Sequence, residues 1–299
     1  MELNQLRYFV AVAELGSFTR AAERSHVSQP SLSQQIAKLE REMAQPLFER
    51  LGRQVKLTEP GRALYQRVVG ILRGVDEAKS AVSGASGWES GELSVGAIMT
   101  VAPYFLPDTV RTFLRKYPKA RLTIRESFTQ QIVKDCLSGE LDVGLVVLPI
   151  KEERLVIEPL FSEELLLAFP ARHPLLNRKR ITLEELSKEA FVLLDEMHCL
   201  GEQMVSFCRQ NECLPVVACK TAQLLTVQEM VGLGQGVSLV PTMAAQTDRT
   251  KKCVYRSLGP DAPRRTLAMI WHQDRFRSRL ADSFVAMLRQ SKAKKNGTK

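Results

Sequence analysis

The sequence contains no long apolar run and no targeting segment. Its 299 residues include no stretch of about 18 uncharged apolar residues, which a membrane-spanning helix requires. The first residues, Met1–Gln5, carry an acid and lack the basic and apolar regions of a signal peptide. These absences exclude a membrane span, and we expect the chain to stay in the cytosol with no membrane among its partners.

The cysteines lack the spacing of a metal site. The chain has six of them, and no two form a C-x2-C pair, so we expect no structural zinc and no other metal or cofactor. Cysteines in a reducing compartment are usually small buried apolar residues. Four of the six lie between residues 199 and 219, however, and this clustering bears on function below.

Length and composition predict a folded protein of two domains. Apolar residues make up 44% of the chain, enough for a sizeable core. The net charge is +9, and residues 289–299 supply more than half of it, with five basic residues and no acid. A basic total permits nucleic-acid binding without establishing it. Only a DNA-binding or RNA-binding sequence motif would indicate nucleic-acid binding.

Residues 1–60 have the pattern of an all-α winged helix-turn-helix domain. Apolar residues three and four apart predict short helices, and Ser17 and Ser28 stand at expected N-caps. Two short extended segments around Gly52 predict a β-hairpin with Arg50 and Arg53 at its basic tip. The third predicted helix presents on its outer face Gln29, Pro30, Ser31, Ser33, Gln34 and Lys38.

This outer face suits double-stranded DNA, because hydroxyl and amide side chains can hydrogen-bond base edges in the major groove. Such contacts discriminate less sharply than a bidentate arginine. We therefore expect specificity to depend on paired half-sites and on DNA shape at the wing. Arg50 and Arg53 are placed for phosphates or the minor groove; the alternative is that they are ordinary solvated arginines.

Residues 61–88 predict a long linker helix that ends in a Gly- and Ser-rich segment. Its apolar residues alternate in steps of four and three, which is typical of a coiled-coil seam and implies a second copy of the chain. The alternative is that this stripe packs against its own domain. The stripe consists of Leu64, Val68, Ile71, Val75, Ala78 and Val82.

Residues 89–299 alternate between predicted strands and helices, which indicates an α/β domain. The apolar run Asp142–Leu148 is typical of a parallel strand buried on both faces. Gly232, Gly234 and Gly236 lie between a predicted helix and a strand, the reverse of the order in a dinucleotide-binding loop. We therefore interpret them as turn glycines.

Several segments together resemble the LysR-type transcriptional regulators. They are SFTRAAE (17–23), VSQPSLSQQIAKLE (27–40), LFER (47–50), LTEPG (57–61), LSGELD (137–142) and MVGLGQGVSLVP (230–241). The resemblance implies a DNA-bound homotetramer built from homodimers, contact with RNA polymerase, and no enzymatic activity. It also implies that the regulatory domain has two subdomains, as periplasmic binding proteins do, and binds an effector between them.

The segment from Leu194 to Cys208 resembles the redox segment of the peroxide-sensing members of this family. Carried over by position, Cys199 would be the peroxidatic cysteine and Cys208 the resolving one, leaving the other four cysteines structural. One departure is Met197, where those members usually have glycine. The residues that would hold hydrogen peroxide are Thr100, Thr129 and His198, with Arg265 a weaker candidate.

The chemistry of this segment can be argued without the family. A thiolate attacks peroxide, and both His198 and a helix starting near Leu200 would favour the thiolate of Cys199. The resulting sulfenic acid condenses with a second thiol to a disulfide, which an outside thiol reductant must reset. If residues 199–208 form one helix, the two cysteines lie about 13 Å apart, and a disulfide needs Cα atoms within about 7 Å. Oxidation would then refold the segment and alter the dimer on DNA.

Other interpretations stay open. The cleft could instead bind a small organic anion at the helices that open near Thr100 and Thr129. A solute-binding transport protein would account for the α/β half alone, and a thiol peroxidase with a DNA-binding appendage would require repeated turnover. Cys213 is a rival resolving thiol.

Overall fold

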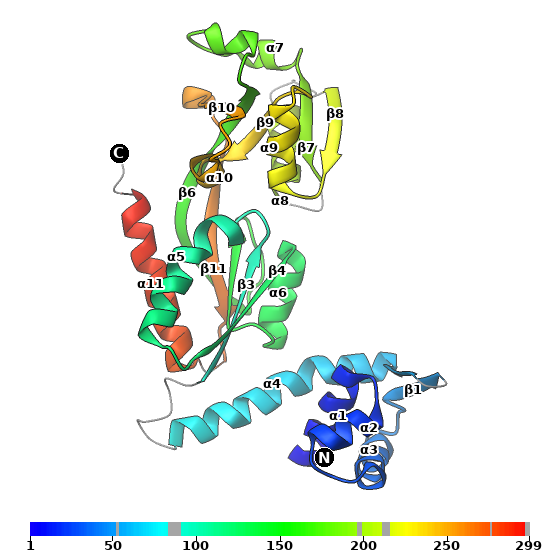
Figure 1. Cartoon of the computed structure of the whole chain (residues 1–299). Helices are drawn as coiled ribbons and strands as arrows, with labels where there is room; N and C mark the ends of the chain where they lie inside the picture. Colours follow the sequence, from blue (N-terminus) through cyan, green and yellow to red (C-terminus); the bar gives the residue numbers. More distant parts are fainter. Residues whose placement is uncertain (52–53, 83–90, 196–198, 211–215, 276, 297–299) are drawn as a thin grey trace. The chain divides into compact units, whose positions relative to one another are not determined.

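The structure is a computed structural model that describes residues 1–51, 54–82, 91–195, 199–210, 216–275 and 277–296. The chain divides into two compact units. One contains Met1–Trp88 and Ser138–Glu140, and the other contains Glu89–Leu137 and Leu141–Lys299. Figure 1 labels the elements of both. Within these ranges, no helix is both long and apolar enough to cross a membrane.

The N-terminal unit is a helical domain with a β-hairpin wing. Its elements are α1 (Leu3–Leu15), α2 (Phe18–Arg24), α3 (Gln29–Met43), β1 (Phe48–Leu51), β2 (Gln54–Leu57) and α4 (Glu59–Val82), with β1 and β2 antiparallel. The two predicted serine caps are confirmed. Ser17 accepts from the backbone N–H of Arg20 at 3.4 Å and Ser28 from that of Ser31 at 3.3 Å, which defines the starts of α2 and α3.

Helix α4 does not present its whole apolar stripe to solvent. Leu64 packs against the core of the N-terminal unit, and Val68, predicted to face a partner chain, is fully buried there. For Val68 the alternative of packing against its own domain is therefore correct. Ile71, in contrast, is 43% exposed. The side chains of Ala78 and Val82 lie outside the described part of α4.

The second unit is an α/β domain, as predicted, and it is built around a seven-stranded mixed sheet beside a separate two-stranded one. Its first elements are β3 (Glu92–Ile98), α5 (Ala102–Lys116), β4 (Arg121–Ser127), α6 (Thr129–Ser138), β5 (Val143–Val147) and β6 (Leu155–Pro170). The chain continues through η2 (Pro174–Asn177), α7 (Leu183–Leu186), β7 (Ala190–Leu194), α8 (Cys199–Gln210), β8 (Val216–Thr221) and α9 (Leu224–Gly232). It ends with β9 (Ser238–Pro241), α10 (Thr242–Thr247), β10 (Cys253–Arg256), η3 (Gly259–Asp261), β11 (Arg264–His272) and α11 (Arg279–Asn296).

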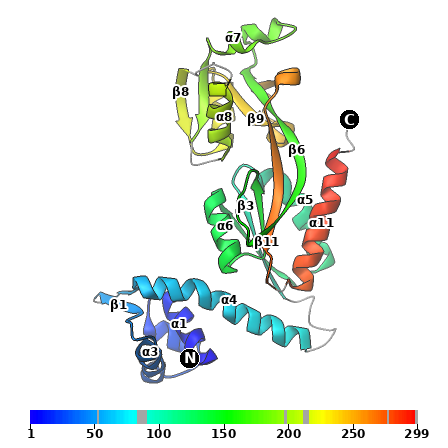
Figure 2. The same ribbon diagram turned by 180° about the vertical axis from the view of Figure 1, so that it is seen from behind.

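Strands β6 and β11 connect two subdomains. The sheet order is β10-β6-β11-β5-β3-β4, and β9 also pairs with β6. The first part of β6 pairs with β11 in one subdomain, and its last residues pair with β9 and β10 in the other, as both views show (Figures 1 and 2). A site at this crossover can contact both subdomains.

Strand β5 explains the apolar run at 142–148. All five of its residues are buried. It pairs in parallel with β3, as predicted, but its other neighbour, β11, runs antiparallel. The sheet is therefore mixed, because β11 returns from the second subdomain into the first.

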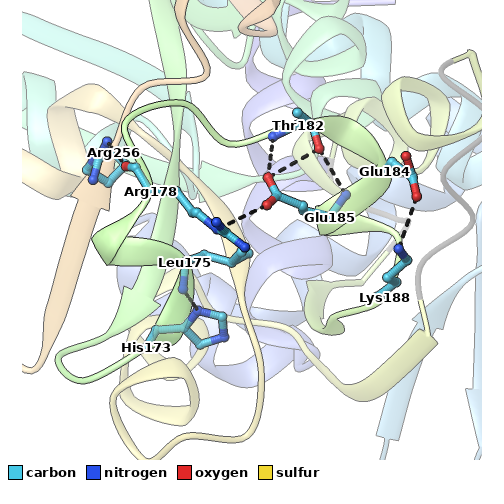
Figure 3. Close-up of polar contacts among 8 residues, drawn as sticks. All are labelled: His173, Leu175, Arg178, Thr182, Glu184, Glu185, Lys188 and Arg256. Carbon is cyan, nitrogen blue, oxygen red and sulfur yellow. Dashed lines mark hydrogen bonds and ion pairs between the residues drawn. The ribbon is translucent and has the colours of Figure 1, made fainter.

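The segment between β6 and β7 is held by short-range polar contacts (Figure 3). Thr182 and Glu185 form a capping box at the start of α7. Arg256 of β10 donates to the backbone carbonyls of Leu176 at 3.0 Å and Arg178 at 3.1 Å. These contacts fasten the segment to the edge of the second subdomain.

Candidate functional site

The outer face of α3 is polar and accessible. Leu32, Ile36 and Leu39 turn the opposite face into the core of the domain. The side-chain amide of Gln29 donates to the hydroxyl of Ser33 at 2.9 Å, which orders the start of this face. Five of the predicted DNA contacts are exposed and Ser33 is half-buried; the exposed residues are Gln29, Pro30, Ser31, Gln34 and Lys38.

Glu40 of α3 holds the base of the wing. Its Oε1 accepts from the backbone N–H of Leu47 at 2.8 Å and of Phe48 at 3.2 Å. This contact could not be predicted from the sequence, because the position of Glu40 in its helix does not distinguish it from a solvated acid. Arg53 lies outside the described residues, and so does the side chain of Arg50.

The two candidate redox cysteines lie on one helix. Cys199 is the first residue of α8 and is half-buried, whereas Cys208 is 1% exposed near its end. Neither forms a disulfide. Nine residues of α-helix separate them by about 13 Å, beyond the roughly 7 Å that disulfide geometry permits between Cα atoms. His198 and Met197, which precede this helix, lie outside the described residues.

Arg265 is the most deeply buried charged side chain at the site. It is 1% exposed. Its Nη1 donates to Thr100 Oγ1 at 3.0 Å and its Nη2 to the carbonyl oxygen of Thr100 at 3.1 Å. Its Nε donates to Glu163 Oε1 at 2.8 Å, and Glu163 Oε2 accepts from the backbone N–H of Met243 at 2.9 Å. The structure thus brings together Arg265 and Thr100, which are 165 positions apart.

The surroundings of Cys199 act on its ionisation in opposite directions. Burial raises the pKa of the thiol, and the carboxylate of Glu202 does so slightly. The Arg265 guanidinium, the Thr129 hydroxyl and the Leu200 backbone lower it, but the net pKa is raised. Among the described groups, burial outweighs the nearby positive charge. His198, on which the expectation of a thiol that ionises near neutral pH also depends, lies outside the described residues, so that expectation stays a prediction.

Two buried oxygen atoms accompany the thiol. Thr129 Oγ1 and Gln203 Oε1 are both inaccessible to solvent, and neither has a hydrogen-bond partner in normal geometry within the described residues. Thr129 nevertheless lies close enough to Cys199 for its hydroxyl to stabilise the thiolate. Gln203 follows Cys199 by four positions in α8, so both lie on the same helix face. Buried polar atoms are normally paired, so these two oxygens are candidates to hydrogen-bond a small molecule that reaches the thiol. Gln203 was missed in the sequence, where the i, i+4 spacing was its only signal.

The family follows from matches along the chain. Residues 3–62 match the family model for the bacterial regulatory helix-turn-helix protein, lysR family. Residues 86–293 match the LysR substrate binding domain. The chain therefore belongs to the LysR family, whose members are DNA-binding transcriptional regulators and not enzymes.

Similar proteins specify the resemblance further. The hydrogen peroxide-inducible genes activator of Dickeya chrysanthemi is 36% identical over 272 residues, 91% of this chain and 89% of the relative. A full-length OxyR from Pseudomonas aeruginosa has a TM-score of 0.79 at 31% identity, covering 98% of this chain and 94% of that one. An H2O2-bound OxyR mutant from Corynebacterium glutamicum has a TM-score of 0.64 at 30% identity, with the same two coverages. The predicted resemblance to peroxide-sensing LysR regulators is confirmed.

Proposed function

We propose that this protein is a transcriptional regulator that senses hydrogen peroxide through Cys199 and Cys208 and activates genes of antioxidant defence. The observation that carries the proposal is the placement of Cys199 at the start of α8, beside Thr129, Gln203 and the Arg265 guanidinium. The similarity to hydrogen peroxide-inducible genes activators and to an H2O2-bound OxyR supports the same effector.

The charge balance of the site favours an uncharged effector over a small organic anion. Among the described residues, the arginine that acts on Cys199 is Arg265, and it is already paired with Glu163, which is itself buried. An anion that entered this site would lose its hydration. Arg265 would not compensate for that loss, because its positive charge is already neutralised by Glu163. Hydrogen peroxide is neutral, and it both donates and accepts hydrogen bonds, as Thr129 Oγ1 and Gln203 Oε1 require.

The reaction has two steps. The Cys199 thiolate attacks one peroxide oxygen, the O–O bond breaks, and the departing hydroxide takes up a proton to leave as water. Thr100, Thr129, Gln203 and His198 are the residues we assign to holding the peroxide. The Cys208 sulfur then attacks the sulfenic acid, the S–O bond breaks, and a second water leaves with the thiol proton.

The second step requires α8 to unwind, because its two ends are too far apart for a disulfide. An unwound segment changes the regulatory domain and, through it, the pairing of subunits on DNA. We assign DNA contact to residues 1–60, pairing to 61–88 and sensing to 89–299. The proposed assembly is a homodimer or homotetramer on paired half-sites in the cytosol that contacts RNA polymerase, and an outside thiol reductant resets it.

The test is peptide mapping by mass spectrometry after a brief exposure of the reduced protein to slight excess hydrogen peroxide. A rapid, dominant Cys199–Cys208 cross-link is expected, and Cys199→Ser should abolish it. Cys219→Ser is the matched control, because Cys219 is a half-buried thiol of the same subdomain on β8, and it should leave the cross-link intact. Free thiols at both positions in wild-type protein would overturn the proposal. A dominant Cys199–Cys213 cross-link would overturn the role of Cys208.

A further inference from the structure

The ion pair at the crossover strands connects three parts of the regulatory unit. Glu163 of β6 and Arg265 of β11 are directly opposite each other in antiparallel register, so their side chains share one face of the sheet. The Glu163 carboxylate uses both oxygens: Oε1 accepts from Arg265 and Oε2 from the backbone of Met243 in α10. Arg265 in turn reaches Thr100, in the turn that follows β3 in the first subdomain, whereas α10 belongs to the second.

Arg265 cannot occupy this place alone. Its side chain is fully buried, and a buried guanidinium without a partner is strongly unfavourable. The only carboxylate to which it donates among the described residues is that of Glu163. Because Oε2 is fixed to a backbone amide, this carboxylate cannot follow Arg265 to another position without breaking that bond.

The orientation of Thr100 depends on the same chain of contacts. Thr100 Oγ1 accepts from Arg265 Nη1, so the hydroxyl must direct its own hydrogen elsewhere. Thr100 is itself 2% exposed, so solvent does not compete for that hydrogen. A shift of Arg265 would therefore release the hydroxyl that we assign to peroxide binding.

We propose that Glu163 is a positioning residue of the peroxide site: it holds Arg265 where the guanidinium orients Thr100 and acts electrostatically on Cys199. This inference rests on the proposed function, since it assigns a role within the same site. Glu163 does not touch the thiol or the peroxide; it acts through Arg265. Its effect on the reaction must therefore disappear when Arg265 is removed.

The experiment is a double-mutant cycle on the full-length protein. The rate constant for Cys199 oxidation by hydrogen peroxide is measured by quenched alkylation and mass spectrometry in wild type, Glu163→Gln, Arg265→Gln and the double variant. Glu163→Gln should slow oxidation about ten- to a hundredfold, the range of one charge-assisted hydrogen bond. In the Arg265→Gln background the same substitution should change the rate less than about twofold.

Glu164→Gln is the matched control. Glu164 is the next residue of β6, so its side chain points to the opposite face of the strand. Its Oε1 is buried with no hydrogen-bond partner within the described residues, so the substitution breaks no contact to Arg265, and this variant should react within about twofold of wild type. Equal slowing by Glu163→Gln in both backgrounds, or no slowing in either, would overturn the inference. If Glu163→Gln does not fold, Glu163→Asp replaces it in the cycle, because the shorter carboxylate keeps the charge but cannot span Arg265 and Met243 together.

Failure of the proposed function gives a different result. If wild-type Cys199 does not react with peroxide, peroxide sensing is refuted, and the same cycle is then measured with iodoacetamide, which needs only the thiolate. If Glu163→Gln changes the alkylation rate only when Arg265 is present, the positioning role is supported. If Glu163→Gln changes the rate equally in the Arg265→Gln background, or does not change it at all, the positioning role is refuted.

Discussion

The requirement that α8 unwinds can be tested without touching either cysteine. Ser206 is an exposed residue in the interior of α8, between Cys199 and Cys208. Because its side chain makes no buried packing contact, Ser206→Ala and Ser206→Gly differ mainly in helix propensity, by about 1 kcal/mol in favour of alanine. If residue 206 leaves the helix on oxidation, the glycine variant has a reduced form that is less stable by that amount.

The consequence is a measurable difference in reduction potential. About 1.4 kcal/mol corresponds to 30 mV for a two-electron couple, so the Ser206→Gly disulfide should have a potential about 20 mV more negative than that of Ser206→Ala. The disulfide formation constants should differ about fivefold. Each variant is equilibrated in glutathione buffers of known potential, and the Cys199–Cys208 cross-link is quantified by mass spectrometry.

The control pair is Thr112→Ala and Thr112→Gly. Thr112 is exposed in the interior of α5, which lies outside the segment that must unwind, so these two variants should have potentials within about 5 mV of each other. Equal potentials for the two Ser206 variants would refute the reasoning, because residue 206 would then remain helical in the oxidised form and the disulfide would have to form by some other movement.

Three further predictions follow from single contacts. Thr129→Val removes a hydroxyl that lowers the pKa of Cys199, so this pKa, measured by thiolate absorbance, should rise. The hydroxyl oxygen has no other hydrogen-bond partner within the described residues, so thermal unfolding should show little loss of stability. Glu40→Ala removes the acceptor of two backbone N–H groups at the wing and should destabilise the N-terminal unit by about 1–3 kcal/mol, with weaker DNA binding by fluorescence anisotropy. Gly201→Ala would place a Cβ 2.5 Å from the carbonyl oxygens of Leu194 and Asp195, so a loss of about 1–3 kcal/mol in denaturant unfolding is expected; an unchanged midpoint would contradict it.

Local chemistry made the N-terminal unit predictable. Ser17 and Ser28 were found from the sequence because an N-cap contacts a backbone group only three residues away. The alternation of strands and helices likewise predicted the class of the regulatory unit. Val68 was misassigned because a heptad stripe does not say which surface will cover it; its own domain does so.

The redox site was only partly predictable, since its polar contacts are long-range. Arg265 and Thr100 were both proposed from the resemblance, but nothing in their spacing indicated that one donates to the other. Glu163 was missed because its partner is set by the register of β6 and β11, which the sequence does not reveal. The burial of Cys199, which raises the pKa of its thiol, was not predictable for the same reason: it depends on which elements cover the thiol.

The position of α8 in the core indicates how far an oxidation signal would extend. Leu200 and Met204 are buried in the same apolar cluster as β7 and α9, and Cys208 is buried beside them on the helix. Removing the first two from apolar surroundings would cost roughly 3–6 kcal/mol at about 1.5–3 kcal/mol each. A domain is typically stable by only about 5–15 kcal/mol, so leaving both side chains exposed would remove a large part of that stability. The oxidised form must therefore bury these side chains again in a new arrangement, so that the disulfide repacks a subdomain and not merely a surface loop.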